Sequence, residues 1–183
     1  MNTICKLALS MVLAFVGLSG YARVVSVADG PYKYKVTSDS TVMLVGDVSY
    51  RDMESVVIPS SVDIDGRTYV VAEIGRNAFK KCKKVKSVEV PASVTKIGDA
   101  AFVGCENLEK VVISQGVMEI GDHAFTDCRS LRKVEIPSSV KMIGNYAFSG
   151  CKDFEVVIDN SKKNVRVGVN AFIGYREVRY LLH

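Results

Sequence analysis

Apolar residues recur from residue 74 onward at a nearly constant step. An Ile-Gly pair begins each copy, at Ile74–Gly75, Ile97–Gly98, Ile120–Gly121 and Ile143–Gly144, with Val167–Gly168 as a looser fifth copy. An Ala-Phe pair follows in every copy and defines an aromatic column: Phe79, Phe102, Phe125, Phe148 and Phe172. Cysteines keep the same step, at Cys82, Cys105, Cys128 and Cys151. The step is 23 residues three times and then 24, and several columns in register at such a period predict stacked repeats.

Each copy predicts one rung of a solenoid. The Val-x-x-Ile-Gly segment is typical of a short strand that ends at a glycine able to adopt a positive φ. The Ala-Phe-x-x-Cys-x-x-Leu segment spaces apolar residues three and four apart, which predicts a short helical or 3₁₀ turn. Segments such as Val88–Val90 and Val134–Ile136 alternate as half-buried strands that end at Pro91 and Pro137. We therefore expect a right-handed stack of 23-residue rungs with parallel β-sheet.

Two further columns follow the cysteines. The first contains Val85, Leu108, Leu131 and Phe154, and the second contains Val88, Val111, Val134 and Val157. One rung cannot bury its apolar face alone, so we expect these columns to join one continuous core.

A different pattern precedes the repeats and predicts an N-terminal cap. Met53–Pro59 matches Val85–Pro91, which indicates a half-rung, and an insert follows that reads as a hairpin turning at Asp65–Gly66. Tyr32–Val36 and Val42–Val45 read as another hairpin. We expect a β cap over residues 23–70 and an array of about five repeats over residues 71–183. Val178–His183 supplies a last strand with no comparable covering.

The first 22 residues have the composition of a secretory signal peptide. Lys6 precedes an apolar stretch from Leu7 to Leu18, and small residues flank Tyr21, so we expect cleavage after Ala22. The stretch is too short to span a bilayer, and no later apolar run is long enough to be a transmembrane anchor. A buried N-terminal helix is the alternative. The expected location is secreted, cell-surface or periplasmic.

The consensus of the copies, Ile-Gly-x-x-Ala-Phe-x-x-Cys-x-x-Leu-x-x-Val-x-Ile-Pro-x-Ser, resembles the BspA-like (Treponema-type) bacterial leucine-rich repeat. The resemblance covers roughly residues 53–183, and repeat five departs from it with Tyr175 near the cysteine position. It implies a leucine-rich-repeat fold in a largely surface-exposed or secreted family, some of whose members adhere to host matrix proteins or other cells. The matching residues are scaffold residues and transfer no ligand site.

Charge adds one candidate ligand-contact cluster. The formal net charge is +4, and it becomes +3 when Lys6 is removed, which is too mild to indicate nucleic acid. Five lysines gather in the first repeat: Lys80, Lys81, Lys83, Lys84 and Lys86. Such a cluster could attract an anionic glycan, although a lysine run is more often a solvated face. No aromatic residue lies among them, which disfavours single-stranded nucleic acid.

Charges of alternating sign follow the leucine column. They are Glu54, Lys86, Glu109, Arg132, Glu155 and Arg179. Opposite charges on neighbouring strands stabilise a sheet modestly, so we expect a ladder that fixes the register, with a ligand-facing role as the alternative.

Four cysteines follow the signal segment, and three interpretations stay open for them. Equivalent residues on neighbouring rungs lie about 4.8 Å apart, which allows buried free thiols or a disulfide between rungs. Four thiols in a line do not form the tetrahedron that zinc prefers. The histidines are His123 and His183, and His123 occupies a variable position that we expect to be solvated.

These features indicate binding, with no catalytic constellation, cofactor or metal. The sequence predicts an exported, non-catalytic module for adhesion or for interaction with an extracellular protein or glycan at the cell surface. A structural subunit that self-associates through its uncovered C-terminal rung is the alternative.

Overall fold

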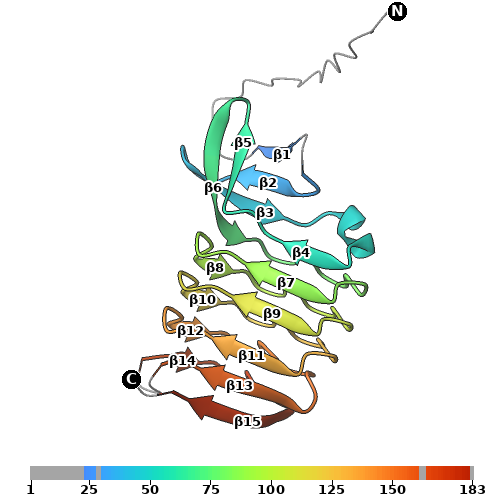
Figure 1. Ribbon diagram of the computed structural model, residues 1–183, viewed down its shortest axis with the longest axis vertical. Coiled ribbons are helices and arrows are strands. Elements are labelled where there is room, and N and C mark those ends of the chain that lie inside the picture. The colour runs from blue at the N-terminus through green and yellow to red at the C-terminus, as the bar shows by residue number, and fades with distance from the viewer. Residues whose placement is uncertain (1–22, 28–29, 161–163, 182–183) are drawn as a thin grey trace, which may run out of the picture.

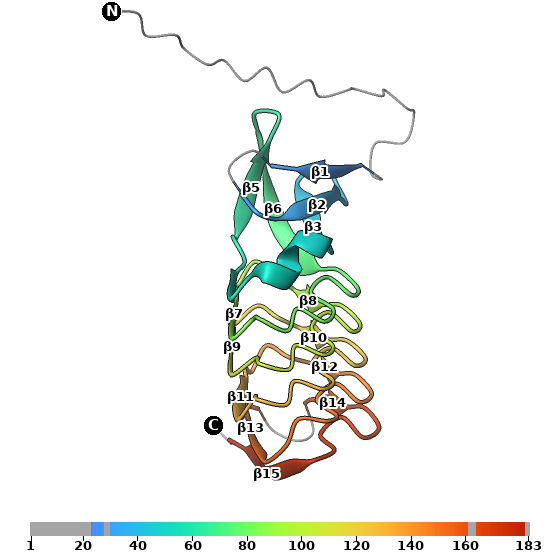
Figure 2. The same ribbon diagram turned by 90° about the vertical axis from the view of Figure 1, so that its right-hand side faces the viewer.

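The chain forms an elongated stack of rungs under an N-terminal cap (Figures 1 and 2). The computed structural model describes residues 23–27, 30–160 and 164–181. The expected signal peptide and His183 lie outside the described residues. The only described helix, η1 (Val48–Asp52), has five residues, so no described helix could cross a membrane.

The cap contains both hairpins that the sequence predicts. Its strands are β1 (Val24–Ser26), β2 (Lys33–Val36), β3 (Thr41–Val45), β5 (Ser61–Ile64) and β6 (Arg67–Ile74). β2 pairs antiparallel with β3, and β5 pairs antiparallel with β6 across a turn in which Asp65 and Gly66 have φ of 52° and 78°. β6 then pairs parallel with β3 and with the first rung, so it runs through the expected boundary at residue 70 and joins the cap to the array.

Each rung contributes one strand to each of two faces of the solenoid, and the strands within each face run parallel. The face with the shorter strands continues from β6 through β8 (Lys96–Ile97), β10 (Glu119–Ile120), β12 (Met142–Ile143) and β14 (Arg166–Val167). The opposite face, which we call the long-strand face, contains β4 (Ser55–Val57), β7 (Ser87–Val90), β9 (Lys110–Ile113), β11 (Lys133–Ile136), β13 (Phe154–Ile158) and β15 (Tyr175–Tyr180). Val56 pairs with Val88, which confirms the half-rung. The repeat-solenoid fold with parallel strands is thus confirmed.

Tight turns connect the two faces on the Ala-Phe side. In the third rung the N–H groups of Ala124, Thr126 and Cys128 each donate to the carbonyl three residues earlier, at 3.1–3.3 Å. His123 and Asp127 have φ of 57° and 60°, and these left-handed residues prevent the turns from merging into a helix. The Phe125 N–H donates to the Ala147 carbonyl of the next rung at 2.7 Å, so the turns also join neighbouring rungs.

The glycine of each Ile-Gly pair has a different role from the one that the sequence suggests. Gly98, Gly121 and Gly144 do not adopt positive φ; that conformation falls two residues later, for example at His123. Their backbone passes close to the preceding rung, where a Cβ on Gly144 would lie 2.5 Å from the Asp122 nitrogen. The expectation of a positive φ was wrong because contact between rungs, and not turn geometry, requires the glycine.

The phenylalanine column forms the centre of the core. Phe79, Phe102, Phe125 and Phe148 are fully buried and stack at successive centroid distances of 5.1 Å. The cap continues this column, since the buried Tyr50 ring lies 5.2 Å from Phe79.

Buried tyrosine hydroxyls seal the N-terminal end of the array. Tyr50 Oη accepts a hydrogen bond from the Lys33 N–H at 2.6 Å, and Tyr32 Oη accepts one from the Val57 N–H at 3.1 Å. Burial raises the pKa of Tyr50 to about 12. Both hydroxyls therefore stay protonated and partnered, and the upper edge of β4 is covered.

Candidate functional site

The cysteine column is buried in the core. Cys82, Cys105, Cys128 and Cys151 are free thiols. Cys105 Sγ donates to the Phe79 carbonyl at 3.2 Å, and Cys128 Sγ donates to the Phe102 carbonyl at 3.4 Å. Burial raises the pKa of Cys82 to about 11 and that of Cys105 to about 12. Protonated thiols without access to solvent are inert, so the column is packing.

His123 lies away from these thiols on the outer surface. Its ring is exposed and stacks on Tyr146 at a centroid distance of 5.2 Å, with Nδ1 3.3 Å from Thr126 Oγ1. Cys128 faces the interior, so the two residues do not form a nucleophile and its base. Among the described residues, no group of three or more His, Cys, Asp or Glu side chains could hold a metal ion.

The lysine cluster is largely neutralised. Lys83 pairs with Glu106 at 2.8 Å, as the column spacing suggests. Two further pairs form with the preceding segment, Lys84–Asp52 at 2.6 Å and Lys86–Glu54 at 3.5 Å.

The neutralisation leaves two of the five lysines available. Lys80 and Lys81 are exposed and make no ion pair within the described part of the chain. Lys86 thus pairs with one of its two neighbours in the charge column, Glu54, and no ion pair joins it to the other, Glu109, within the described residues. A surface of two free lysines is a weak anion site.

The alternating charge column extends only part of the way. The Glu54–Lys86 pair forms, but β11 and β13 pair with Lys133 opposite Glu155 and Val134 opposite Val156. Arg132 therefore misses Glu155 and donates instead to the Lys152 carbonyl at 3.2 Å.

Glu155 and Val157 are consequently each one position away from the columns assigned to them, and Arg179 lies opposite Val157 and not opposite Glu155. Val134 lies six positions after Cys128, whereas Val156 lies five positions after Cys151. Val156 takes the place in the core opposite Val134, whereas Val157, at 9% exposed, is buried outside the core cluster.

A break in the long-strand face is the main feature that the sequence analysis missed. β4, β7 and β9 form one sheet, and β11, β13 and β15 form another, with no ladder recorded between β9 and β11 in the described residues. The short-strand face is continuous at the same height, where Ile120 pairs with both Ile97 and Ile143. The rungs therefore remain stacked, and the break is local to one face.

Two features explain the break between β9 and β11. Like charges face each other there, and one backbone N–H donor is missing. The 23-residue step places Lys133 opposite Lys110, and like charges directly opposed destabilise a sheet. Pro137 also lacks the N–H that Ser114 uses at this place to bond the Val90 carbonyl at 3.1 Å. Pro91 occupies the same position in the intact β4–β7 pair, so the proline alone does not break a ladder.

Like charges also face each other between β13 and β15, but there a neighbouring opposite charge compensates them, which is not the case between β9 and β11. Glu155 lies opposite Glu177 in the intact β13–β15 ladder, where Arg179 reaches Glu155 at 3.5 Å and Glu177 at 3.7 Å. Lys110 makes no ion pair within the described residues, and Lys133 pairs along its own strand with Glu135 at 2.6 Å. Uncompensated charge therefore remains where the ladder is open.

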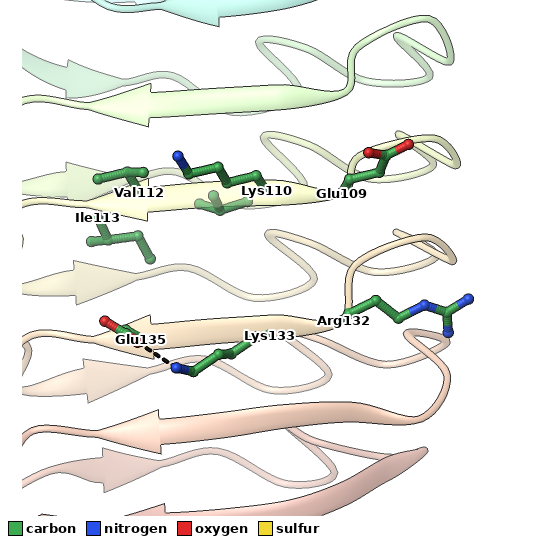
Figure 3. A pocket seen from close by; sticks show the side chains of 8 residues that line it. Glu109, Lys110, Val112, Ile113, Arg132, Lys133 and Glu135 are labelled. Atoms are coloured by element: carbon green, nitrogen blue, oxygen red, sulfur yellow. Dashed lines mark ion pairs between the residues drawn. The ribbon is translucent and has the colours of Figure 1, made fainter.

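The break opens a hollow of about 330 Å³, which we call the β9–β11 groove (Figure 3). Its lining residues are Glu109, Lys110, Val111, Val112, Ile113, Arg132, Lys133 and Glu135. Val111 and Ile113 are 8% exposed here, whereas their equivalents in the neighbouring rungs are at most 1% exposed. Val112, on the outer face, is 39% exposed. A second hollow, of about 410 Å³, shares Ile113 and Glu135 and extends the groove toward Leu181.

Comparison with known families settles the relationship. The family model of the BspA type leucine rich repeat region matches six copies over residues 72–180. The chain belongs to this family. Its rungs are therefore leucine-rich repeats of the BspA type.

Solved structures of bacterial leucine-rich repeat proteins resemble this one. A protein from Bacteroides capillosus is 34% identical, over 74% of this chain and 98% of that one, with a TM-score of 0.64. One from Bacteroides ovatus is 31% identical, over 85% of this chain and 41% of that one, with a TM-score of 0.71. The T. pallidum leucine rich repeat protein is 29% identical, over 84% and 64% of the two chains, with a TM-score of 0.64. No curated protein matches the chain.

The family relationship defines a class of activity. Leucine-rich repeats are general protein-interaction modules, and the family and fold of this chain are those of repeat binding modules and not of known enzymes. Because the buried columns of this BspA-type array serve as scaffold, a specific contact has to come from its outer surface. The β9–β11 groove is the place on the long-strand face where, among the described residues, the ladder between successive rungs is interrupted.

Proposed function

We propose that this leucine-rich repeat protein is an exported, non-catalytic binding module of the cell surface with a role in adhesion. Its contact site is the β9–β11 groove, and its ligand is an extracellular protein. The groove is the single observation on which this assignment rests. Export is supported by the composition of the first 22 residues and by the surface location of the family.

The groove offers hydrogen-bonding groups that a regular sheet would consume. The Lys110 N–H bonds the Lys86 carbonyl at 3.1 Å, so by alternation the backbone groups of Val111 and Ile113 point toward β11. The Glu155 N–H likewise bonds the Arg132 carbonyl at 2.8 Å, so the groups of Lys133 point toward β9. A ligand that enters the groove can satisfy these donors and acceptors, which costs less than leaving them unpaired.

The side chains of the groove favour a protein over a glycan. Val112 supplies exposed apolar area, and Lys110 lies near the Lys133–Glu135 pair, so apolar and charged contacts are adjacent. None of the eight lining residues is aromatic, so a sugar ring would find no stacking partner. An apolar core with a charged rim is characteristic of protein interfaces.

Export of the full chain is expected to produce a protein that begins at Arg23. The apolar stretch must enter the secretion machinery, so Leu13→Arg should leave the chain inside the cell. Intact-mass measurement of the medium and periplasm of a bacterial host checks this, with Thr3→Arg as the control that adds the same charge outside the stretch. An exported protein that retains residues 1–22 would contradict the prediction.

Binding is expected to weaken when a charge reversal allows β9 and β11 to pair and so closes the groove. Lys110→Glu places a carboxylate opposite Lys133, so attraction replaces repulsion and the β9–β11 ladder can form. The measurement is retention of the exported protein on immobilised fibronectin, laminin, collagen and heparin. We expect a protein ligand in this panel to lose roughly tenfold or more in affinity with this variant, which corresponds to ~1.4 kcal/mol.

Lys80→Glu is the matched control, because it makes the same charge change in the lysine cluster. It should leave binding to the protein ligand unchanged. Retention on heparin that falls with Lys80→Glu and not with Lys110→Glu would place the site at the cluster instead. Equal loss in both variants would indicate a general charge effect and reject the groove.

A further inference from the structure

The C-terminal end of the array presents an open sheet edge. β15 pairs with β13 on one side and with no other strand in the described residues (Figure 1). The Leu181 N–H donates to the Ile158 carbonyl at 2.8 Å. Because the N–H groups of a strand alternate in direction, those of Val178 and Tyr180 point to the open edge.

Apolar side chains are exposed at this end. Tyr175 is 54% exposed and Ile173 is 47% exposed, although the stacked core lies directly behind them. Val178 and Tyr180 pack on the core but are only partly buried. The N-terminal end is different, because Tyr32 covers the edge of β4 there. Within the described residues, the long-strand face is therefore covered at its N-terminal end and open at its C-terminal end.

The charges on β15 complement a second copy of the same strand. Glu177 and Arg179 lie opposite Glu155 and Val157 and face outward, with Val178 between them facing the core. If two β15 strands run antiparallel about Val178, Glu177 of each copy lies opposite Arg179 of the other. Val178 then forms a hydrogen-bonded pair with itself, and the Glu177–Arg179 pairs fall at the non-hydrogen-bonded positions, where side chains are closest.

We propose that the chain forms a symmetric dimer through antiparallel pairing of β15 with β15 of a second copy. The pairing continues the three-stranded sheet β11-β13-β15 across the two-fold axis and covers the exposed apolar end. This inference goes beyond the proposed binding function and does not depend on the groove.

The alternatives to a symmetric dimer are disfavoured by the same residues. Parallel in-register stacking would place Glu177 on Glu177 and Arg179 on Arg179. Head-to-tail stacking requires a free strand edge at the other end of the long-strand face, where the Val57 N–H is already bonded to Tyr32. A two-fold interface uses one surface twice and closes after two copies, so the assembly stops at a dimer.

The test measures the mass of the full chain, purified after expression, by sedimentation at a series of concentrations. We expect the mass of two chains. Glu177→Arg places arginine at both outward positions, 177 and 179, and Arg179→Glu places glutamate at both. Each reversal turns two attractive pairs into repulsive ones, so each variant should weaken dimerisation roughly tenfold or more. An equimolar mixture of the two variants should form a heterodimer, because each arginine then faces a glutamate.

Mixing keeps the test independent of folding defects, since an unfolded variant could not gain a partner. Glu89→Arg, on the exposed face of the internal strand β7, is the matched control and should remain a dimer. A monomeric wild-type chain would overturn the proposal. So would a dimer that is insensitive to both reversals, or two monomeric variants that do not associate when mixed.

Discussion

Phe125→Ala is expected to lower the free energy of unfolding by about 3–5 kcal/mol. The ring is fully buried at the middle of the aromatic column, 5.1 Å from Phe102 on one side and 5.1 Å from Phe148 on the other. Its removal deletes two ring contacts and leaves a void, and the rungs cannot close it because Phe125 N–H and Ala147 remain hydrogen-bonded at 2.7 Å. In a solenoid the loss falls on the coupling between neighbouring rungs.

Urea unfolding followed by circular dichroism measures the effect. Phe172→Ala is the matched control at the end of the column, where the ring is 8% exposed and stacks on one aromatic neighbour, Phe148, at 5.8 Å. We expect it to cost less than half as much as Phe125→Ala. A loss below about 1 kcal/mol for Phe125→Ala would show that the ring is not a core contact.

The columns could be predicted because their positions recur in each rung. A residue type that repeats at the rung step occupies the same place in successive rungs, as the direct pairing of Ile97 with Ile120 and of Ile120 with Ile143 confirms. The cap hairpins were also predictable, since Asp65–Gly66 is a local turn signal that needs no tertiary information.

The register of the fifth strand could not be predicted in the same way. Val156 and Val157 are both valine, so the apolar pattern cannot decide which one faces the core. The chain resolves this by shortening the segment after Cys151 by one residue, and the charge column shifts with it. Likewise, Lys84 pairs with Asp52 of η1. Asp52 lies outside the repeats, so the column spacing could not predict this pair.

The β9–β11 groove depends on a balance that composition does not show. Lys110 and Lys133 are visible in the sequence, as is Pro137, yet Glu155 and Glu177 are also like charges and their ladder is intact. The difference is the position of Arg179, which reaches both glutamates. Whether a sheet breaks therefore depends on a third residue, and its side-chain direction is a tertiary property.

Gly144→Ala is expected to destabilise the array by roughly 3 kcal/mol, at the upper end of overpacking substitutions. The added Cβ would lie 2.5 Å from the Asp122 nitrogen and 2.5 Å from the Gly121 carbonyl carbon. Both obstacles are backbone atoms, so no side-chain rotation can relieve the contact. The rungs would have to separate locally, against the Gly144 N–H bond to the Ile120 carbonyl at 2.7 Å.

Gly30→Ala is the control for this substitution, because a Cβ at Gly30 meets nothing within 4 Å. It should be neutral or slightly stabilising, since alanine reduces the entropy of the unfolded chain. Thermal unfolding of the two variants beside the unsubstituted chain distinguishes a contact role from a backbone role for the glycine of the Ile-Gly pair. If Gly144 were needed for an unusual φ, alanine and serine would both destabilise the chain, and the loss of stability would not depend on the size of the side chain. The close contact instead predicts that stability falls further from alanine to serine to valine, and a flat series would disprove the inter-rung contact.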